Sequence, residues 1–215
     1  MQQAMQKKGA MNVAVFASGR GSNFQAILHA IDAGTVPAQI VVLISNSAHA
    51  GALETARGHG IPAMHMSEKQ FINEQEFSNR LLAVLREHQV EAIALAGYLK
   101  RVPPQVIQQF RNRILNIHPA LLPFFGGAGM YGHHVHEAVL ASGMKVSGAT
   151  VHLVNEDYDR GAILIQRTVE VAAGDSAESL AAKILKVEHE IFPIALKALA
   201  ENRIKIEGNK AWITL

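Results

Sequence analysis

Two polar side chains at the end of a hydrophobic strand are the first candidates for chemistry in this sequence. In "ILNIHPALLP", residues 114–123, Asn116 and His118 are two residues apart, so in a strand they project from the same face. Pro119 and Pro123 stiffen the exit and help to hold both side chains. An amide N–H beside an imidazole can stabilise a developing oxyanion and move a proton. A satisfied core histidine with a capping asparagine is the alternative interpretation.

A third polar group for this pair is offered by "VHLVNEDYDRGAIL", residues 151–164. His152 lies within a predicted strand, and the turn that follows holds Asn155, Glu156, Asp157 and Asp159. A carboxylate that approached His118 would raise the pKa of the imidazole and fix its tautomer. Spacing alone does not choose among these candidates.

A glycine loop near the start of the chain suggests an anion site. In "ASGRGSNFQAI", residues 17–27, a strand passes through two glycines into a helix, whose free N–H groups favour an anion. Ser22 and Asn23 can add side-chain donors. Phe24 replaces the third glycine of a dinucleotide fingerprint, and no lysine follows Gly21 as in a Walker loop. The loop therefore suits a phosphate monoester, and an ordinary glycine turn with Ser22 as N-cap is the alternative.

The segment "GHHVHEA", residues 132–138, brings three histidines together without the spacing of a metal site. His133, His134 and His136 lack the His–x–x–x–His pattern of a metal-binding helix, and the chain has no cysteine. We therefore expect no metal. The preceding "FFGGAGMYG" is rich in glycine and is interpreted as a mobile substrate loop.

The elements that must position these groups alternate along most of the chain. Apolar strands separated by helices predict a doubly wound, mostly parallel α/β sheet with helices on both faces. Strands are expected at residues 12–18, 39–45, 61–66, 91–97 and 113–118, and helices from residue 22 and over 50–60, 74–88 and 103–110.

The pattern changes in the last third of the chain. Strands over 145–155 and 161–171 are joined by a short loop, which predicts an antiparallel pair. A helix over 176–199 is expected to be capped by Asp175 or Ser176, and "RIKIEGNKAWITL" predicts a hairpin that turns at "GN".

Composition narrows the class of protein. With 215 residues, 49% of them hydrophobic, the chain can build one substantial core, so residues 11–215 are expected to form a single domain. The absence of cysteine excludes disulfides and thiolate chemistry, and a net charge of +2 gives no support for nucleic-acid binding. No apolar run approaches the roughly 20 residues of a membrane span, so we expect a cytoplasmic protein. Residues 1–10 are interpreted as a disordered extension.

Five motifs together resemble a known family. "SGRGSNFQAI", "LAGYLKRV", "ILNIHPALLP", "GATVHLVNEDYDRGAIL" and "EHEIFP" occur in the order typical of the phosphoribosylglycinamide formyltransferases, within the wider formyltransferase family. The resemblance extends from Met11 to near the end of the chain. It implies a Rossmann-like sheet of about seven strands, and transfer of a formyl group from 10-formyltetrahydrofolate to the amine of 5-phosphoribosylglycinamide in purine biosynthesis.

The resemblance also implies roles for the strand-end residues. Asn116 would hydrogen-bond the formyl oxygen and contact the folate, His118 would handle protons, and Asp159 would raise the pKa of His118. No metal is implied, and the partners would be small molecules, with the protein a monomer or a homodimer.

The same resemblance assigns the binding residues. It places the substrate phosphate on Gly21, Ser22 and Asn23, and the rest of the ribonucleotide near Glu188 and His136. It places the folate against two segments: Leu99, Lys100, Arg101 and Val102, and Asn155, Glu156, Asp157 and Tyr158.

Three features depart from the family's usual pattern. Lys100 stands where the family often has arginine, and the loop over 124–135 is longer than in compact members. The region around Glu74 lacks the usual basic residue, for which Lys69 or Arg80 is a possible substitute.

Three other functions fit the sequence less well. A 10-formyltetrahydrofolate hydrolase usually carries a further N-terminal domain, for which the ten residues before the first strand leave no room, and tends to have histidine in place of Pro119. A methionyl-tRNA formyltransferase would need a further C-terminal domain. A non-catalytic folate or nucleotide sensor on the same fold is opposed by the retention of Asn116, His118 and Asp159.

Overall fold

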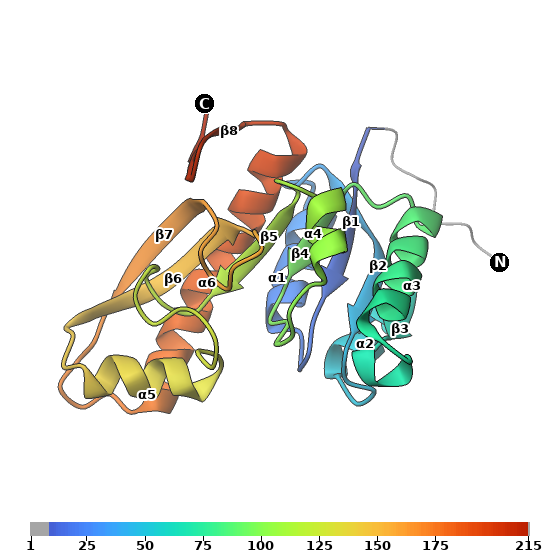
Figure 1. Ribbon diagram of the computed structural model, residues 1–215. Helices are drawn as coiled ribbons and strands as arrows, with labels where there is room; N and C mark the ends of the chain where they lie inside the picture. The colour runs from blue at the N-terminus through green and yellow to red at the C-terminus, as the bar shows by residue number, and fades with distance from the viewer. Residues whose placement is uncertain (1–8, 215) are drawn as a thin grey trace.

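A computed structural model describes residues 9–214 of the chain (Figure 1). The predicted disordered extension over residues 1–10 therefore lies almost entirely outside the described residues. The described part begins just before the first strand.

Seven strands form one twisted sheet in the order β3-β2-β1-β4-β5-β6-β7. The first five are parallel to one another, whereas β6 runs antiparallel to both β5 and β7, which confirms the predicted change in the last third. A separate hairpin, β8 and β9, turns at "GN" as predicted. The strands are β1 Met11–Phe16, β2 Ala38–Ser45, β3 Ala63–His65, β4 Ala92–Leu95, β5 Ile114–His118, β6 Val146–Leu153, β7 Ile163–Glu170, β8 Ile204–Glu207 and β9 Lys210–Ile213.

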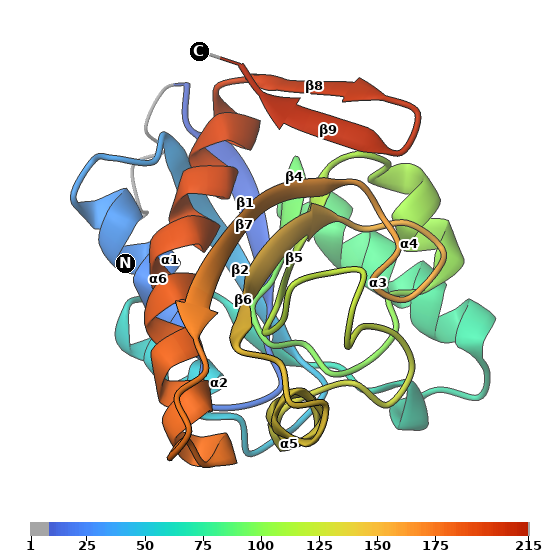
Figure 2. The ribbon, with the colours of Figure 1, turned by 90° about the vertical axis from the view of Figure 1, so that its left-hand side faces the viewer.

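Helices cover both faces of the sheet. Figure 2 shows α1, α2 and α6 on one face and α3 and α4 on the other. The elements are α1 Ser22–Asp32, α2 Gly51–Gly58, α3 Glu74–Glu87, α4 Pro104–Gln109, α5 His133–Ala141, α6 Ala177–Ala200 and the 3₁₀ turn η1 Glu68–Gln70. Ser176, one of the two predicted caps, accepts from the backbone N–H of Ser179 at the start of α6.

The strands divide their side chains between two cores, because alternate residues face opposite sides of a sheet. In β1, Val13 and Val15 pack into the core beneath α1 and α6, whereas Ala14 and Phe16 pack into the core beneath α3 and α4. This double burial explains why the strands are nearly continuous apolar runs rather than alternating ones.

Helix α5 was not predicted. The loop expected over residues 124–135 overlaps its first turn, since the helix begins at His133. Its N-cap is Gly132, without a side-chain cap, so the usual signal of a helix start is missing. Val135, His136 and Val139 are buried at helical spacing. Because one of these three positions is a histidine, the apolar pattern of the helix was not recognised.

Gly21 fixes the turn from β1 into α1. It is the N-cap of α1 with a φ of 82°, and no side chain caps the helix, so the alternative of Ser22 as an ordinary N-cap does not apply. A Cβ atom on Gly21 would lie 2.7 Å from Cβ of Ala52 in α2. The sequence uses glycine here for both its backbone conformation and the close approach of α2.

Substitution of Gly21 by alanine tests this double requirement. We expect Gly21→Ala to lower the free energy of unfolding by about 2–4 kcal/mol, because it adds a clash to the cost of a left-handed alanine. Gly34→Ala is the control: its φ is 72° but nothing lies within 4 Å of the added Cβ, so we expect a loss of only about 1 kcal/mol. Equal losses in urea denaturation would contradict a role for Ala52.

Candidate active site

The main cavity lies where the order of the strands reverses. Strand β2 lies on one side of β1 and β4 on the other, and ligands of open α/β sheets bind at the carboxyl ends of strands beside such a reversal. The cavity has a volume of about 710 Å³. Its walls include the loop after β1, the segments 97–102, 116–119, 127–133 and 154–159, and one side of α6.

Asn116 and His118 occupy the same face of β5, as their spacing predicted. They continue the face of Ile114, which packs in the core beneath α3 and α4, while Leu115 and Ile117 pack in the opposite core. Beyond Ile114 this face opens into the cavity, and both polar side chains line it.

Asp159 is the carboxylate that the structure brings to this pair. Its Oδ2 lies 3.6 Å from Nδ1 of His118, and its Oδ1 accepts from Nδ2 of Asn116 at 3.4 Å. Burial alone would raise the pKa of Asp159, but the neighbouring His152 and His118 and the Gly127 N–H together lower it. The backbone at Asp159 is left-handed, with a φ of 53°, which aspartate tolerates better than most residues.

His118 is held between Asp159 and a backbone carbonyl. Its Nε2 donates to the carbonyl of Phe125 at 2.8 Å, so the hydrogen of the neutral ring lies on Nε2 and Nδ1 can take up a proton beside Asp159. Burial lowers the pKa of His118, and Asp159 and the Phe125 carbonyl oppose that effect without overcoming it. The expected upward influence of a carboxylate is therefore present, but the net direction is downward.

Three further groups belong to this cluster and were not assigned from the sequence. Nε2 of His152 lies 3.0 Å from Nδ2 of Asn116 and 3.5 Å from Oδ1 of Asp159. Its Nδ1 bonds to the carbonyl of Leu153, so Nε2 is the acceptor for Asn116. The backbone N–H of Gly127 donates to Oδ2 of Asp159, and the Phe125 carbonyl holds His118. The position of a backbone group cannot be predicted from residue type. Of these three groups, only His152, which lies opposite Asn116 on β6, could therefore have been predicted from the sequence.

One arm of the cavity extends between α1, α5 and α6. Ser22, Asn23, His136 and Glu188 line it, whereas Gly21 is not among the described lining residues and packs against α2 instead. Arg20, two residues before Ser22, also lines the cavity. The cavity therefore holds the predicted phosphate donors and an additional cation.

Glu188 of α6 is a buried carboxyl that faces Asn23 of α1. Nδ2 of Asn23 donates to Oε2 of Glu188 at 2.6 Å, while Oδ1 of Asn23 and Nδ1 of His136 are buried without a hydrogen-bond partner among the described residues. Burial raises the pKa of Glu188 to about 7, against a smaller lowering by Asn23. The arm thus holds polar atoms that a bound ligand could satisfy.

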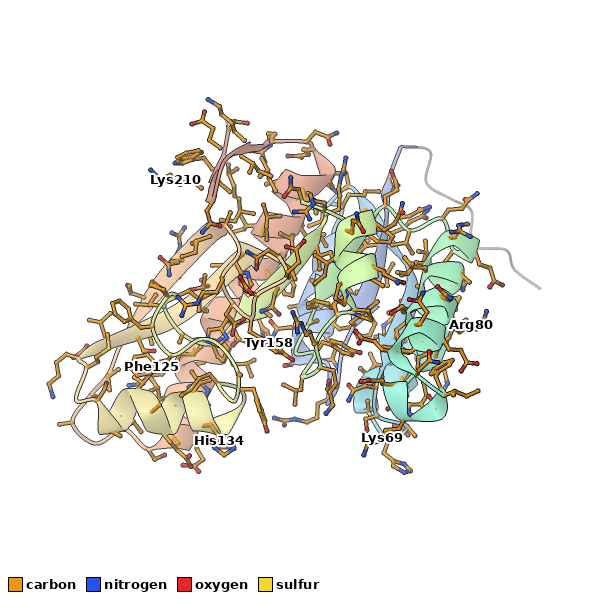
Figure 3. The ribbon with its side chains drawn as sticks, in the orientation of Figure 1. Lys69, Arg80, Phe125, His134, Tyr158 and Lys210 are labelled. Carbon is orange, nitrogen blue, oxygen red and sulfur yellow. The ribbon has the colours of Figure 1, made fainter. Side chains whose placement is uncertain are left out.

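The other arm is lined by both predicted folate segments. All four residues from Leu99 to Val102 and all four from Asn155 to Tyr158 face it. Lys69 and Arg80, considered as substitutes for a basic contact near Glu74, do not line the cavity in the described structure. Figure 3 shows both of them beside η1 and α3, away from Tyr158.

No group of three or more histidine and carboxylate side chains that could hold a metal ion occurs within residues 9–214. The three histidines of "GHHVHEA" are separated at the start of α5. His136 is buried, whereas the side chain of His134 is 65% exposed and pairs with Glu137.

Comparison with known proteins gives consistent matches over most of the chain. The model of a family described as formyl transferase matches residues 11–196. A chloroplastic phosphoribosylglycinamide formyltransferase of Arabidopsis thaliana is 46% identical over 90% of this chain and 66% of its own length. The phosphoribosylglycinamide formyltransferase of Haemophilus influenzae is 37% identical over 94% of this chain and 92% of its own.

A solved structure agrees with these matches. Glycinamide ribonucleotide transformylase 1 from Symbiobacterium toebii superposes with a TM-score of 0.91 at 37% identity, covering 100% of this chain and 99% of that one. The chain thus spans slightly less than two thirds of the plant relative and nearly the full length of the two bacterial proteins.

The buried carboxyl of Glu188 makes stability depend on pH. Its pKa is about 7 in the folded state against an ordinary value of 4.5, so between these values the native state keeps a proton that the unfolded chain has released. The wild type should therefore lose stability relative to Glu188→Gln as pH rises from about 4.5 to about 7, by on the order of 2–3 kcal/mol. The glutamine can still accept from Asn23.

Urea denaturation of both proteins at several pH values checks this expectation. Glu190→Gln, an exposed position on the same helix, serves as control and should leave the pH dependence of the wild type intact. A constant difference between wild type and Glu188→Gln from pH 5 to pH 8 would contradict the raised pKa.

Proposed function

We propose the following function for this chain, which belongs to the formyl transferase family. The enzyme transfers a formyl group from 10-formyltetrahydrofolate to the amine of 5-phosphoribosylglycinamide, a step of purine biosynthesis. The names of its relatives in Arabidopsis and Haemophilus support this assignment.

The observation that carries the proposal is that one polar cluster and two groups of candidate binding residues line a single cavity. Asn116, His118 and Asp159 contact one another and line the same cavity as both arms. The arm with Ser22, Asn23 and Glu188 suits a phosphorylated, hydroxylated substrate. The arm lined by segments 99–102 and 155–158 suits a flat ring with a polar edge, since loop backbone groups can recognise such an edge.

The cluster can perform the proton transfers that formyl transfer requires. The substrate amine attacks the formyl carbon, and the carbonyl oxygen gains negative charge as a tetrahedral intermediate forms. The amine then loses a proton, the bond between the formyl carbon and N10 of the folate breaks, and N10 gains a proton. We assign the proton handling to His118, whose Nδ1 lies beside Asp159, and the stabilisation of the imidazolium to Asp159.

Asn116 would stabilise the charged oxygen through its amide N–H. In the free enzyme both N–H groups are directed within the cluster, to His152 at 3.0 Å and to Asp159 at 3.4 Å. The longer bond is the weaker one, so the formyl oxygen would take its place. His152 keeps the amide oriented during that exchange.

The remaining expectations belong to the same proposal. No helix within residues 9–214 is long and apolar enough to cross a membrane. We retain the cytoplasm as the expected location, although the Arabidopsis relative is named chloroplastic. We also propose that the protein is a monomer or a homodimer.

Removal of either member of the proton-handling pair tests these roles. We expect His118→Ala and Asp159→Asn to lower kcat by about 10²–10⁴, with KM values changed by less than about threefold, because both groups act mainly in the transition state. The measurement is formyl transfer from 10-formyl-5,8-dideazafolate with and without the ribonucleotide. His134→Ala, an exposed histidine of α5 outside the cavity, should keep wild-type rates.

The same assay separates the alternatives. Folate turnover that does not depend on the ribonucleotide would favour the hydrolase, and folate binding without any turnover would favour the sensor. Wild-type kcat in either His118→Ala or Asp159→Asn would overturn the roles assigned to the pair.

A further inference from the structure

Two exposed arginines converge on one residue of the loop that carries Asp159. Nη2 of Arg101, between β4 and α4, donates to the backbone carbonyl of Glu156 at 2.5 Å. Nη2 of Arg111, after α4, pairs with Oε1 of the same glutamate at 2.6 Å. Backbone and side chain of Glu156 are thus both held by the segment that connects β4 to β5.

Arg101 makes a second contact with this loop. Its guanidinium carbon lies 5.9 Å from the ring centroid of Tyr158, within the range of a cation–π interaction. Figure 3 shows Tyr158 near the centre of the molecule. The guanidinium of Arg101 is therefore directed at the loop, although the residue also lines the cavity.

The loop over residues 154–162 needs such an anchor at one end only. Its far end is fixed by the bonds of Asp159 and by Gly161, where an added Cβ would lie 1.7 Å from the carbonyl oxygen of Leu153. The residues of its first half take part in two hydrogen bonds within the loop. One is an Asx turn, in which the N–H of Asp157 donates to Oδ1 of Asn155 at 3.1 Å, and the other is a longer bond of 3.4 Å from the N–H of Arg160 to the carbonyl of Asp157. Residues 155–158, which line the folate arm, thus depend on contacts from outside the loop.

We propose that Arg101 and Arg111 are positioning residues that clamp residues 155–158 into the wall of the folate arm. That the ligand of this arm is a folate rests on the proposed function. The clamp itself rests only on the contacts described above. It also changes the expected part of Arg101, whose guanidinium holds the wall instead of the folate. Neither Arg111 nor this use of Arg101 follows from the motifs in the sequence.

The clamp should act locally rather than on the whole fold. Exposed ion pairs contribute roughly 0–1 kcal/mol to stability, and the side chains of Arg111 and Glu156 are 59% and 47% exposed. Lys205 and Glu207 on β8 form a matched control, with a distance of 2.7 Å and exposures of 63% and 59%, outside the cavity. A general effect of losing a surface ion pair would appear equally in both places.

The first experiment does not depend on any reaction. Amide hydrogen exchange is measured for peptides covering residues 154–160 in the wild type, Arg101→Ala, Arg111→Ala and Lys205→Ala. We expect exchange about two- to fivefold faster in the two clamp variants, and unchanged exchange in β5 and in the control. Unchanged exchange in both clamp variants would overturn the proposal, even if the enzyme proved to have another activity.

The second experiment separates binding from chemistry. Because Asp159 has its own anchors, Arg111→Ala should raise KM for the formyl folate about two- to fivefold and Arg101→Ala about five- to tenfold, with kcat and the ribonucleotide KM within about twofold of wild type. Arg111→Lys should restore most of the folate KM, since lysine can still pair with Glu156. Arg101→Lys should restore little, since it loses the planar contact with Tyr158.

Two further results complete the test. Arg111→Ala combined with Glu156→Ala should raise the folate KM no more than the worse single variant, because both remove one interaction. The difference between wild type and Arg111→Ala should shrink as salt rises from about 0.05 M to about 0.5 M. Additive effects, a loss of kcat with unchanged folate KM, or the same change in Lys205→Ala would each contradict the clamp.

Discussion

One partly buried carboxylate, that of Asp159, connects the parts of the chain that form the site. It reaches β5 through Asn116 and His118, β6 through His152, and the segment after β5 through the Gly127 N–H. An ionised carboxylate that is mostly removed from water is stable only when hydrogen-bond donors or cationic groups surround it. The neighbours of Asp159 must therefore be placed accurately for its side chain to stay ionised. The left-handed backbone at Asp159 and the tight packing of Gly161 follow from that requirement.

The pKa values of two carboxyl groups in the cavity, Asp159 and Glu188, shift in opposite directions because their surroundings differ. Donors on several sides lower the pKa of Asp159, whereas Glu188 has only the amide of Asn23 and its pKa rises to about 7. Divergent pKa values of neighbouring titratable groups are typical of sites that separate proton handling from binding. The cavity thus combines a charged centre with an arm whose carboxyl is poised between its two protonation states.

Much of the architecture was accessible from the sequence, and the reasons are physical. Strands buried on both faces give apolar runs, and a period of two placed Asn116 and His118 on one face. Helix α5 was missed because a buried histidine and an uncapped start hide its pattern. The approach of Asp159 to Asn116, 43 residues away, depends on the pairing of β6 with β5, which sets His152 opposite Asn116. No local spacing encodes that pairing, and only family resemblance identified Asp159. The contacts of the Phe125 carbonyl and the Gly127 N–H could not be predicted from residue type, because both are backbone groups.

The bond between Asn23 and Glu188 joins positions 165 residues apart, one in the first helix and the other in the last. During synthesis on the ribosome, the glycine loop and the strand-end pair would therefore emerge long before the residue that closes their arm of the cavity. Helix α6 also packs along α1 and against β6, so the same docking event completes both the hydrophobic core and the pocket. A partly made chain would have its chemical groups but no closed cavity around them, which ties completion of the proposed site to the end of folding.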